Sequence, residues 1–232
     1  MKVKLLRYTA DPELLCGAAA LTSTRSGSPS EIFEKIDLER AKQIIRRVTG
    51  YGHASVIEHA SFTFSIEGVS RAMTHQLVRH RIASYTQQSQ RYVTYNTLDK
   101  FVTPPSIMEN AEAKEIFNAA LELISETYKK LLDMGIPKED ARFILPNAAK
   151  TNIIVTMNAR ELRHFFNLRC CARSQWEIRE VALQMLKQAK EVAPALFENA
   201  GPSCVELGYC PEGKMKPPEC NVEEIKKRFR NL

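Results

Sequence analysis

The chain has 232 residues, of which 44% are hydrophobic and 26% are charged, the ordinary composition of a globular protein with a buried core. No apolar run approaches the roughly 20 residues of a membrane span, and the N-terminal stretch MKVKLLRYT is too short and too alternating for a signal peptide. We therefore expect a cytoplasmic protein that does not enter the membrane. The net charge of +6 favours anionic ligands but does not identify them.

Secondary structure can be predicted along the N-terminal part of the chain. KVKLLRYT (residues 2–9) is typical of a strand, and a helix should follow it with Asp11 as N-cap and Pro12 at its first position. Apolar residues then recur at helical spacing from Ser30 to Val48, which predicts one helix.

In the next segment the apolar residues recur at every second position instead of at helical spacing. SFTFSIEG (residues 61–68) alternates apolar and polar side chains, as a strand with one buried face does. SRAMTHQLVRHR (residues 70–81) predicts a helix, and its last turn should hold Arg79, His80 and Arg81.

A long amphipathic helix is predicted in the middle of the chain. Ser106 and Glu109 resemble a capping box, and apolar residues follow at three- and four-residue spacing from Ile116 to Leu131. The later stretch TNIIVTM (residues 151–157) is too apolar and too branched for a surface loop.

Two more helices are predicted by their caps. Asn158 and Glu161 should open a helix that runs through Cys170, and Ser174 with Glu177 should begin a last long helix. Helices that bracket two or three strands predict an α/β or α+β fold. We expect a single domain over residues 1–232, with a small central sheet flanked by long helices and a solvated basic tail from about residue 213.

The cysteines do not have the regular spacing of a disulfide framework, so we expect reduced thiols at Cys16, Cys170, Cys171, Cys204, Cys210 and Cys220. The last three contain no C-x-x-C pair and no neighbouring histidine, which makes zinc the weaker interpretation. Cys170 and Cys171 follow Arg169, and a neighbouring cation can lower the pKa of a thiol and activate it as a nucleophile. We favour the alternative that both are small buried side chains on a helix.

The stretch RHRIASYTQQSQRYV (residues 79–93) concentrates cationic side chains beside hydroxyl and amide groups and contains no acid. A nucleic-acid surface and a pocket for a small phosphorylated molecule both fit this composition. The segment from Arg79 to Arg91 contains no lysine, and arginine is preferred where a planar fork meets a phosphate in fixed geometry. The pocket is therefore the favoured interpretation.

Two other segments carry similar side chains. NARELRHFFNLRCCARSQWEIR contains Asn158, Arg160, His164 and Arg169, and GYGHASVIEHASFTF contains His53, Ser55, Glu58 and His59. His164 comes four residues after Arg160, so the two share one face of a helix.

The basic stretch matches a known motif. Every fixed position of R-H-R-x-x-S-x-x-x-x-S-x-R, found in the flavin-dependent thymidylate synthases, is present as Arg79, His80, Arg81, Ser84, Ser89 and Arg91. The resemblance continues through HASVIEH, ARFILP and NARELRHFFNLR to SQWEIR, so it covers most of the chain in the expected order.

The resemblance implies an enzyme that methylates dUMP to dTMP without a cysteine nucleophile. Methylenetetrahydrofolate would be the carbon donor, bound FAD the hydride carrier and NADPH the reductant. It also implies a homotetramer whose active sites lie at subunit interfaces.

The resemblance assigns residues to each ligand. Those implied for FAD are His53, Ser55, Arg79, His80, Arg81, Gln87, Asn158, Arg160 and His164. Those implied for dUMP are Gln76, Leu77, Val78, Arg79, Gln87, Gln88, Ser89, Gln90, Arg91, Arg142 and Arg169. Arg169 would face the uracil ring as the catalytic residue, and no metal is expected. Ser55 and Gln87 stand where some members carry Thr and Glu, which keeps the polarity of both positions.

Two alternatives stay open from the sequence. One is a basic RNA-binding protein without flavin, whose binding would fall steeply with salt. The other is a flavoprotein with a different substrate. The resemblance favours a flavin-dependent thymidylate synthase over both alternatives and predicts no nucleic-acid partner.

Overall fold

The computed structural model describes residues 1–95 and 97–232. Within them the chain forms one four-stranded sheet in the order β1-β2-β4-β3. The strands are β1 Lys2–Tyr8, β2 Ser61–Ser70, β3 Ala83–Gln87 and β4 Lys150–Asn158. The mixed fold with a small sheet confirms the predicted fold class. The sequence predicted two or three strands and a continuation of the stretch after Arg81 as loop and strand, which β3 confirms, although β3 alternates only half-buried and exposed positions.

The pairing of β2 with β4 is antiparallel. The hydroxyl groups of Thr63 and Thr156 lie 2.9 Å apart, and farther along β2 the Gly68 N–H donates to Asn152 Oδ1 at 2.8 Å. Residue numbers therefore rise along β2 while they fall along its neighbour. The alternation predicted for residues 61–68 is confirmed, since Phe62, Phe64 and Ile66 are completely buried.

The chain divides into two compact units. The first unit contains residues 1–2, 66–79 and 86–154, and the second unit contains residues 3–65, 80–85 and 155–232.

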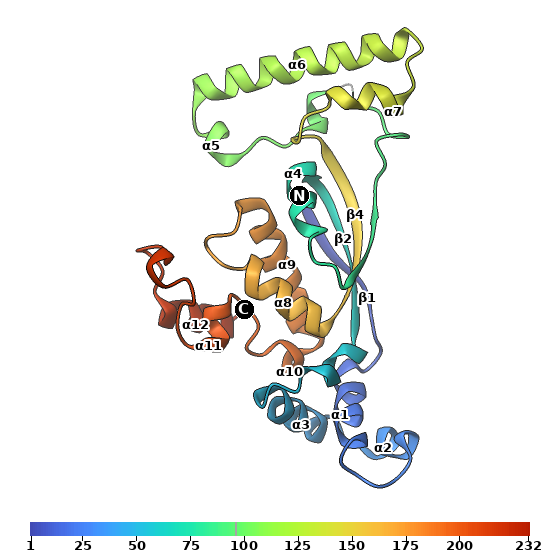
Figure 1. Ribbon diagram of the computed structural model, residues 1–232, viewed down its shortest axis with the longest axis vertical. Coiled ribbons are helices and arrows are strands. Elements are labelled where there is room, and N and C mark those ends of the chain that lie inside the picture. The colour runs from blue at the N-terminus through green and yellow to red at the C-terminus, as the bar shows by residue number, and fades with distance from the viewer. Residues whose placement is uncertain (96) are drawn as a thin grey trace. The chain divides into compact units, whose positions relative to one another are not determined.

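In the first unit a long helix covers a small core. Its helical segments are α4 Arg71–Leu77, η2 Leu98–Lys100, α5 Pro105–Met108, α6 Ala111–Asp133, α7 Lys138–Ala141 and η3 Arg142–Ile144. The helix α6 packs against α5 and α7 (Figure 1). Leu121 and Tyr128 of α6 are buried against Tyr95, Phe101 and Ala149.

The second unit holds the other helical segments. They are α1 Pro12–Thr22, α2 Pro29–Lys35, α3 Leu38–Gly50, η1 Ala54–His59, α8 Ala159–Arg169, α9 Trp176–Val192, α10 Pro194–Phe197, α11 Ser203–Leu207, η4 Gly213–Met215 and α12 Val222–Arg230. Phe62, Phe166 and Phe197 pack edge to face in its core, with ring centroids 5.2 and 6.0 Å apart. Helices α1, α2 and α3 gather together (Figure 1).

Five predicted helices have different boundaries or caps in the structure. The segment from Ser30 to Val48 forms two helices, because α2 ends at Lys35 and the Asp37 side chain accepts from Arg40 N at 2.8 Å to cap α3. The predicted capping box at Ser106 is wrong, since α6 begins at Ala111 and its N-cap is Asn110.

The predicted helix over residues 70–81 ends early. Its C-cap is Val78, so Arg79, His80 and Arg81 lie beyond the helix and lead into β3. The His80 carbonyl instead accepts a hydrogen bond from Tyr85 Oη at 2.8 Å.

The predicted cap at Asn158 is confirmed, since its Oδ1 accepts from Glu161 N at 2.9 Å. The helix α8 ends at Arg169, and Cys170 is its C-cap rather than its last residue. Gln175, and not Ser174, caps α9.

The C-terminal segment differs from the solvated tail that the sequence predicted. Residues 222–230 form α12, which packs against α11, and Phe229 is buried. A side chain at Gly201 would meet the Phe229 ring at 2.7 Å, so the glycine permits this close packing. No helix within residues 1–95 and 97–232 is long and apolar enough to cross a membrane.

Candidate active site

Most residues predicted for the flavin lie on two elements of the second unit that pack together. His53 is the N-cap of η1 and Ser55 lies within it, while Asn158 caps α8 and Arg160 belongs to its first turn. The two elements are in contact, and Arg160 forms an ion pair with Glu58 of η1. The structure therefore gathers exposed polar and cationic groups from segments about a hundred residues apart.

His80 lies beside this group but is buried, with 4% of its surface exposed. Arg169 Nε donates to His80 Nε2 at 3.1 Å, and His80 Nδ1 lies 3.3 Å from Glu161 Oε1. The Phe165 ring meets the imidazole edge-on at 4.9 Å. His80, Glu161 and Arg169 thus form a connected chain of titratable groups.

The protonation state of His80 follows from these contacts. Burial, with smaller contributions from nearby Arg169 and His164, lowers its pKa from 6.5 to about 4. Neutral imidazole has one donor nitrogen and one acceptor nitrogen. Because Nε2 accepts from Arg169, the proton resides on Nδ1, which faces Glu161.

The two partners of His80 also have shifted pKa values. Burial raises the pKa of Glu161, and nearby His164 lowers it in part. Burial lowers the pKa of Arg169, although a guanidinium stays cationic at neutral pH. A fixed positive charge is therefore held in a partly dry environment, where electrostatic interactions are strong.

Residues predicted for dUMP lie mostly in the first unit. Gln87 Nε2 donates to the hydroxyl groups of Thr74 and Thr151 at 3.1 and 3.3 Å. The backbone of Gln88 is fixed by an N–H bond to Asn152 O at 2.8 Å and by Arg71 Nη2, which donates to Gln88 O at 2.7 Å. These bonds anchor the chain where it leaves β3.

Two predicted arginines meet at one acidic residue. Arg91 Nη2 lies 2.6 Å from Glu139 Oε2, and Arg142 Nε donates to Glu139 O at 3.1 Å. Ser89 Oγ accepts from Arg91 N at 3.2 Å. An anion that binds Arg91 must therefore compete with the Glu139 carboxylate.

Most of the remaining residues predicted for dUMP lie at the C-terminal end of α4 or directly after it in the chain. Leu77 is completely buried, so only its backbone could reach a ligand, whereas the next two residues, Val78 and Arg79, are exposed. Gln76 and Gln90 are half-buried. Arg79 and Arg81 are both exposed, and neither forms an ion pair with a carboxylate of the residues that the structure describes.

The predicted residues thus fall into two groups. His53, Ser55, His80, Arg81, Asn158, Arg160, His164 and Arg169 belong to the second unit, and Gln76, Leu77, Val78, Arg79, Gln87, Gln88, Ser89, Gln90, Arg91 and Arg142 belong to the first. Sequence reasoning missed Glu161 and Glu139 as possible partners of site residues. Glu161 was interpreted only as part of a helix cap, although its position three residues before His164 placed its side chain near the same helix face.

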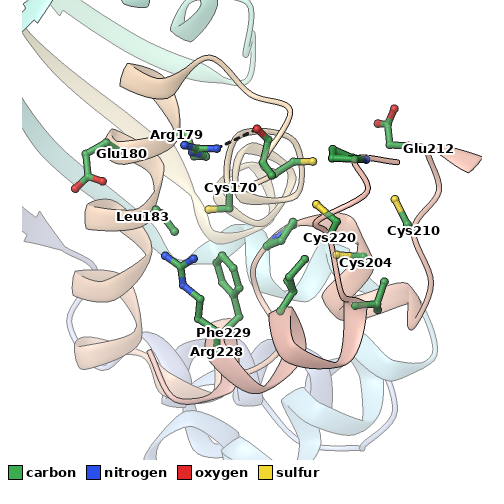
Figure 2. Close-up of a pocket in the computed structure, with 16 residues that line it drawn as sticks. Cys170, Arg179, Glu180, Leu183, Cys204, Cys210, Glu212, Cys220, Arg228 and Phe229 are labelled. Carbon is green, nitrogen blue, oxygen red and sulfur yellow. Dashed lines mark hydrogen bonds between the residues drawn. The ribbon is translucent and has the colours of Figure 1, made fainter. Parts of the chain in front are cut away.

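The cysteines gather elsewhere in the second unit. Figure 2 shows a cavity of about 310 Å³ lined by Cys170, Cys171, Cys204, Cys210 and Cys220 together with residues of α9 and α12. Its lining includes none of the predicted site residues. All six cysteines have free thiols, as predicted. Within the described part of the chain, no three His, Cys, Asp or Glu side chains are arranged to hold a metal ion.

Burial raises the pKa of the thiols of Cys170, Cys204 and Cys220. Burial likewise raises the pKa of Cys16 to about 12. These thiols are therefore protonated at neutral pH and are poor nucleophiles.

Comparison with known proteins decides the family. Residues 4–195 match the family model described as thymidylate synthase complementing protein. The flavin-dependent thymidylate synthase of Geobacter sulfurreducens is 50% identical over 234 residues, which cover 100% of this chain and 99% of the relative. That of Pyrococcus horikoshii is 50% identical over 239 residues, with 100% and 98% covered. The chain belongs to the flavin-dependent thymidylate synthase family.

Solved structures of related enzymes share the fold. The flavin-dependent thymidylate synthase of Helicobacter pylori, complexed with FAD and dUMP, has a TM-score of 0.70 at 26% identity and covers 87% of this chain and 100% of its own. A UMP/dUMP methylase, PolB of Streptomyces cacaoi, bound with 5-Br dUMP, has a TM-score of 0.71 at 27% identity, with 85% and 93% covered. Family membership and enzymatic function, both predicted from the arginine-histidine-arginine motif, are confirmed. The RNA-binding alternative is not supported.

Proposed function

We propose that this flavin-dependent thymidylate synthase converts dUMP to dTMP with methylenetetrahydrofolate as carbon donor and NADPH as reductant. The methylene unit forms a bond to C5 of uracil while its bonds to the folate nitrogens break and tetrahydrofolate leaves; C5 loses a proton, and a hydride reduces the unit to a methyl group. FAD, when bound, supplies that hydride after taking it from NADPH. The observation that carries the proposal is the full-length relationship at 50% identity to enzymes of this name.

The residues on η1 and α8 fit the flavin. Its pyrophosphate is an anion that arginine binds through charge-assisted hydrogen bonds, and Arg81 and Arg160 are both exposed. His53, Ser55 and Asn158 add polar groups on elements that are packed against each other. We assign these residues, with Arg79, Gln87, His80 and His164, to the FAD site.

The arginines of the first unit fit the phosphate of dUMP. A phosphate dianion that binds Arg91 and Arg142 would replace the carboxylate of Glu139 at Arg91, while Arg142 Nε can keep its bond to the Glu139 backbone carbonyl. Ser89 and the glutamines that flank it offer neutral hydrogen-bonding groups. We assign Gln76, Leu77, Val78, Arg79 and residues 87–91 to the same substrate.

Arg169 is the catalytic residue in this proposal. Carbon transfer requires a more nucleophilic C5, which negative charge on the uracil ring provides, and a guanidinium placed against the ring stabilises that charge. Burial lowers the pKa of Arg169, but an arginine guanidinium is not deprotonated in proteins, so the charge remains. Thiol addition is not required, and the raised pKa of the buried cysteines disfavours it.

We further propose that the enzyme is a cytoplasmic homotetramer with shared active sites and no membrane or nucleic-acid partner. The helix α6 supports assembly, because Ile116 and Leu123 are 66% and 65% exposed while Leu121 and Tyr128 on its other side are buried. A helix with apolar residues on both sides covers one of them with a partner.

The test is product formation by the purified protein. We expect dTMP when dUMP, methylenetetrahydrofolate, NADPH and FAD are all present, and none when any one is omitted. UMP is assayed in parallel, because one structural relative is a UMP/dUMP methylase. A colourless protein that cannot be reconstituted with FAD and forms no dTMP would contradict the proposal.

A further inference from the structure

We propose that Glu161 and His80 are positioning residues for the catalytic guanidinium of Arg169: the Glu161 carboxyl group, beside His80 Nδ1, sets the imidazole tautomer, and Nε2 accepts a hydrogen bond from Arg169. The inference rests on the proposed function, in which Arg169 meets the uracil ring. It gives His80 a task other than direct contact with FAD, and it gives Glu161 a task beyond the cap of α8.

The geometry gives the direction of the hydrogen bond between Arg169 and His80 and the group that lies nearest the other ring nitrogen. Arg169 Nε donates to His80 Nε2 at 3.1 Å, so Nε2 carries no proton. The proton on Nδ1 faces Glu161 Oε1 at 3.3 Å. Nδ1 has no hydrogen-bond partner among the residues that the structure describes, so the neighbouring carboxyl oxygen acts through its charge, which favours the tautomer with the proton on Nδ1 and leaves Nε2 able to accept from Arg169.

The burial of His80 and Glu161 shows that their contact is not an exposed ion pair on the surface. The side chains of His80 and Glu161 are only 3% and 8% exposed, and burying a carboxyl group is costly unless a donor compensates it. The cap of α8 does not need this side chain, since Asn158 Oδ1 bonds to the backbone N–H of Glu161. The carboxyl group is therefore explained by its contact with the imidazole.

The imidazole is restrained from several sides. The Phe165 ring packs edge-on against it with an interplanar angle of 79°, and the His164 ring lies 5.7 Å away. Tyr85 Oη donates to the His80 carbonyl at 2.8 Å, which fixes the backbone. The ring thus presents Nε2 to Arg169 in one orientation.

The hydrogen bond to His80 restricts Arg169, whose long side chain would otherwise adopt many rotamers. Fixing Nε removes much of this freedom before the substrate arrives and orients the terminal NH₂ groups. A preorganised charge stabilises a transition state better than a mobile one does. Loss of the chain should therefore reduce turnover while the charge itself remains.

The experiment uses full-length, FAD-loaded protein and compares Glu161→Gln in two backgrounds. The amide keeps the size of the carboxyl group, but it can turn its NH₂ toward Nδ1 and select the tautomer that cannot accept from Arg169. In the wild-type background we expect kcat at saturating dUMP to fall by about 10-fold or more, the scale seen when the partner of a functional group is lost. FAD content should stay unchanged.

In the Arg169→Lys background the same substitution should change the remaining kcat by less than about twofold, because the contact is already gone. The matched control is Glu13→Gln, which alters another buried carboxyl group, one that accepts from Ala195 N in the same unit. It should leave kcat unchanged.

Equal losses from Glu161→Gln in both backgrounds, or no loss in either, would overturn the inference. If this variant does not fold, His80→Gln in the same two backgrounds makes the same comparison and is judged by the same criterion. Wild-type protein that forms no dTMP would instead refute the proposed function, so the two failures are distinguishable.

Discussion

Arg169 is a single charge on which the proposed chemistry depends. It is half-buried at the end of α8, and its Nε is held by His80. Replacing it by alanine removes a charge that is used mainly in the transition state. We expect Arg169→Ala to keep its fold and flavin but to lose methylation by about 100-fold or more, as measured by initial rates at saturating dUMP. Near-normal turnover under these conditions would show that another residue activates the ring.

His80 should make stability depend on pH. Its folded pKa of about 4 lies below the ordinary 6.5, so between these values the unfolded chain binds a proton that the folded protein does not. Stability should therefore fall as the pH drops from 6.5 toward 4, by on the order of 3 kcal/mol from this group.

Urea unfolding of wild type and His80→Gln at several pH values isolates this contribution. The loss of stability on acidification should be smaller in the variant, because it has no imidazole at this position to be protonated. The raised pKa of Glu161 opposes the effect of His80, and the comparison removes that contribution if Glu161 keeps its pKa in both proteins. Identical pH dependence in the two proteins would contradict a buried neutral histidine.

The cationic side chains were predictable from the sequence, but their partners were not. Arg79, Arg81 and Arg91 belong to a spaced motif that the chain carries in full. Glu161 and Glu139 do not stand out, because a glutamate in the first turn of a helix is common and its contact with a distant residue depends on tertiary packing. The role of His80 was likewise hidden until its burial was known.

Helices were predicted more reliably than their ends. Apolar spacing located α6, and polar residues interpreted as caps located α8 and α9. The ends depended on single side chains such as Asp37 and Asn110, which cap helices where the periodicity continues through them. Capping is a local hydrogen bond that apolar periodicity does not report.

The close packing of α1 against α3 gives a prediction about stability. A Cβ atom on Gly17 would lie 2.6 Å from Ala41 Cβ, too close for the two helices to keep their separation. We expect Gly17→Ala to destabilise the protein by roughly 1 to 3 kcal/mol, measured by denaturant unfolding. Gly50→Ala is the control, because no atom lies within 4 Å of its Cβ position. Equal stabilities of the two variants would mean that the helices are not this closely packed.

The division of the chain into two compact units could not be predicted from the sequence. The first unit is assembled from three separate stretches of chain, and neither composition nor a linker marks their boundaries. The burial of Phe229 was not predicted either, because many basic residues surround it in the C-terminal segment. A single apolar residue in a charged helix is a weak signal until its partner surface is known.

Assembly supplies a prediction for the whole enzyme. Leu123→Glu places a charge on the exposed apolar side of α6, where we propose that subunits meet. We expect a shift from tetramer to smaller species and loss of flavin, measured by gel filtration with absorbance at flavin wavelengths. Glu122→Gln alters the adjacent exposed position and should leave the tetramer intact. A tetrameric Leu123→Glu protein with full flavin would exclude this face from the interface.

The proposed reaction is tested most directly by following the bound flavin through one turnover without oxygen. NADPH should bleach the yellow protein, and subsequent dUMP with methylenetetrahydrofolate should restore its colour with about one dTMP formed for each FAD. This result requires that the hydride reach the transferred carbon by way of the flavin. A flavin that stays bleached, or dTMP that forms without any change in its absorbance, would contradict the proposed function.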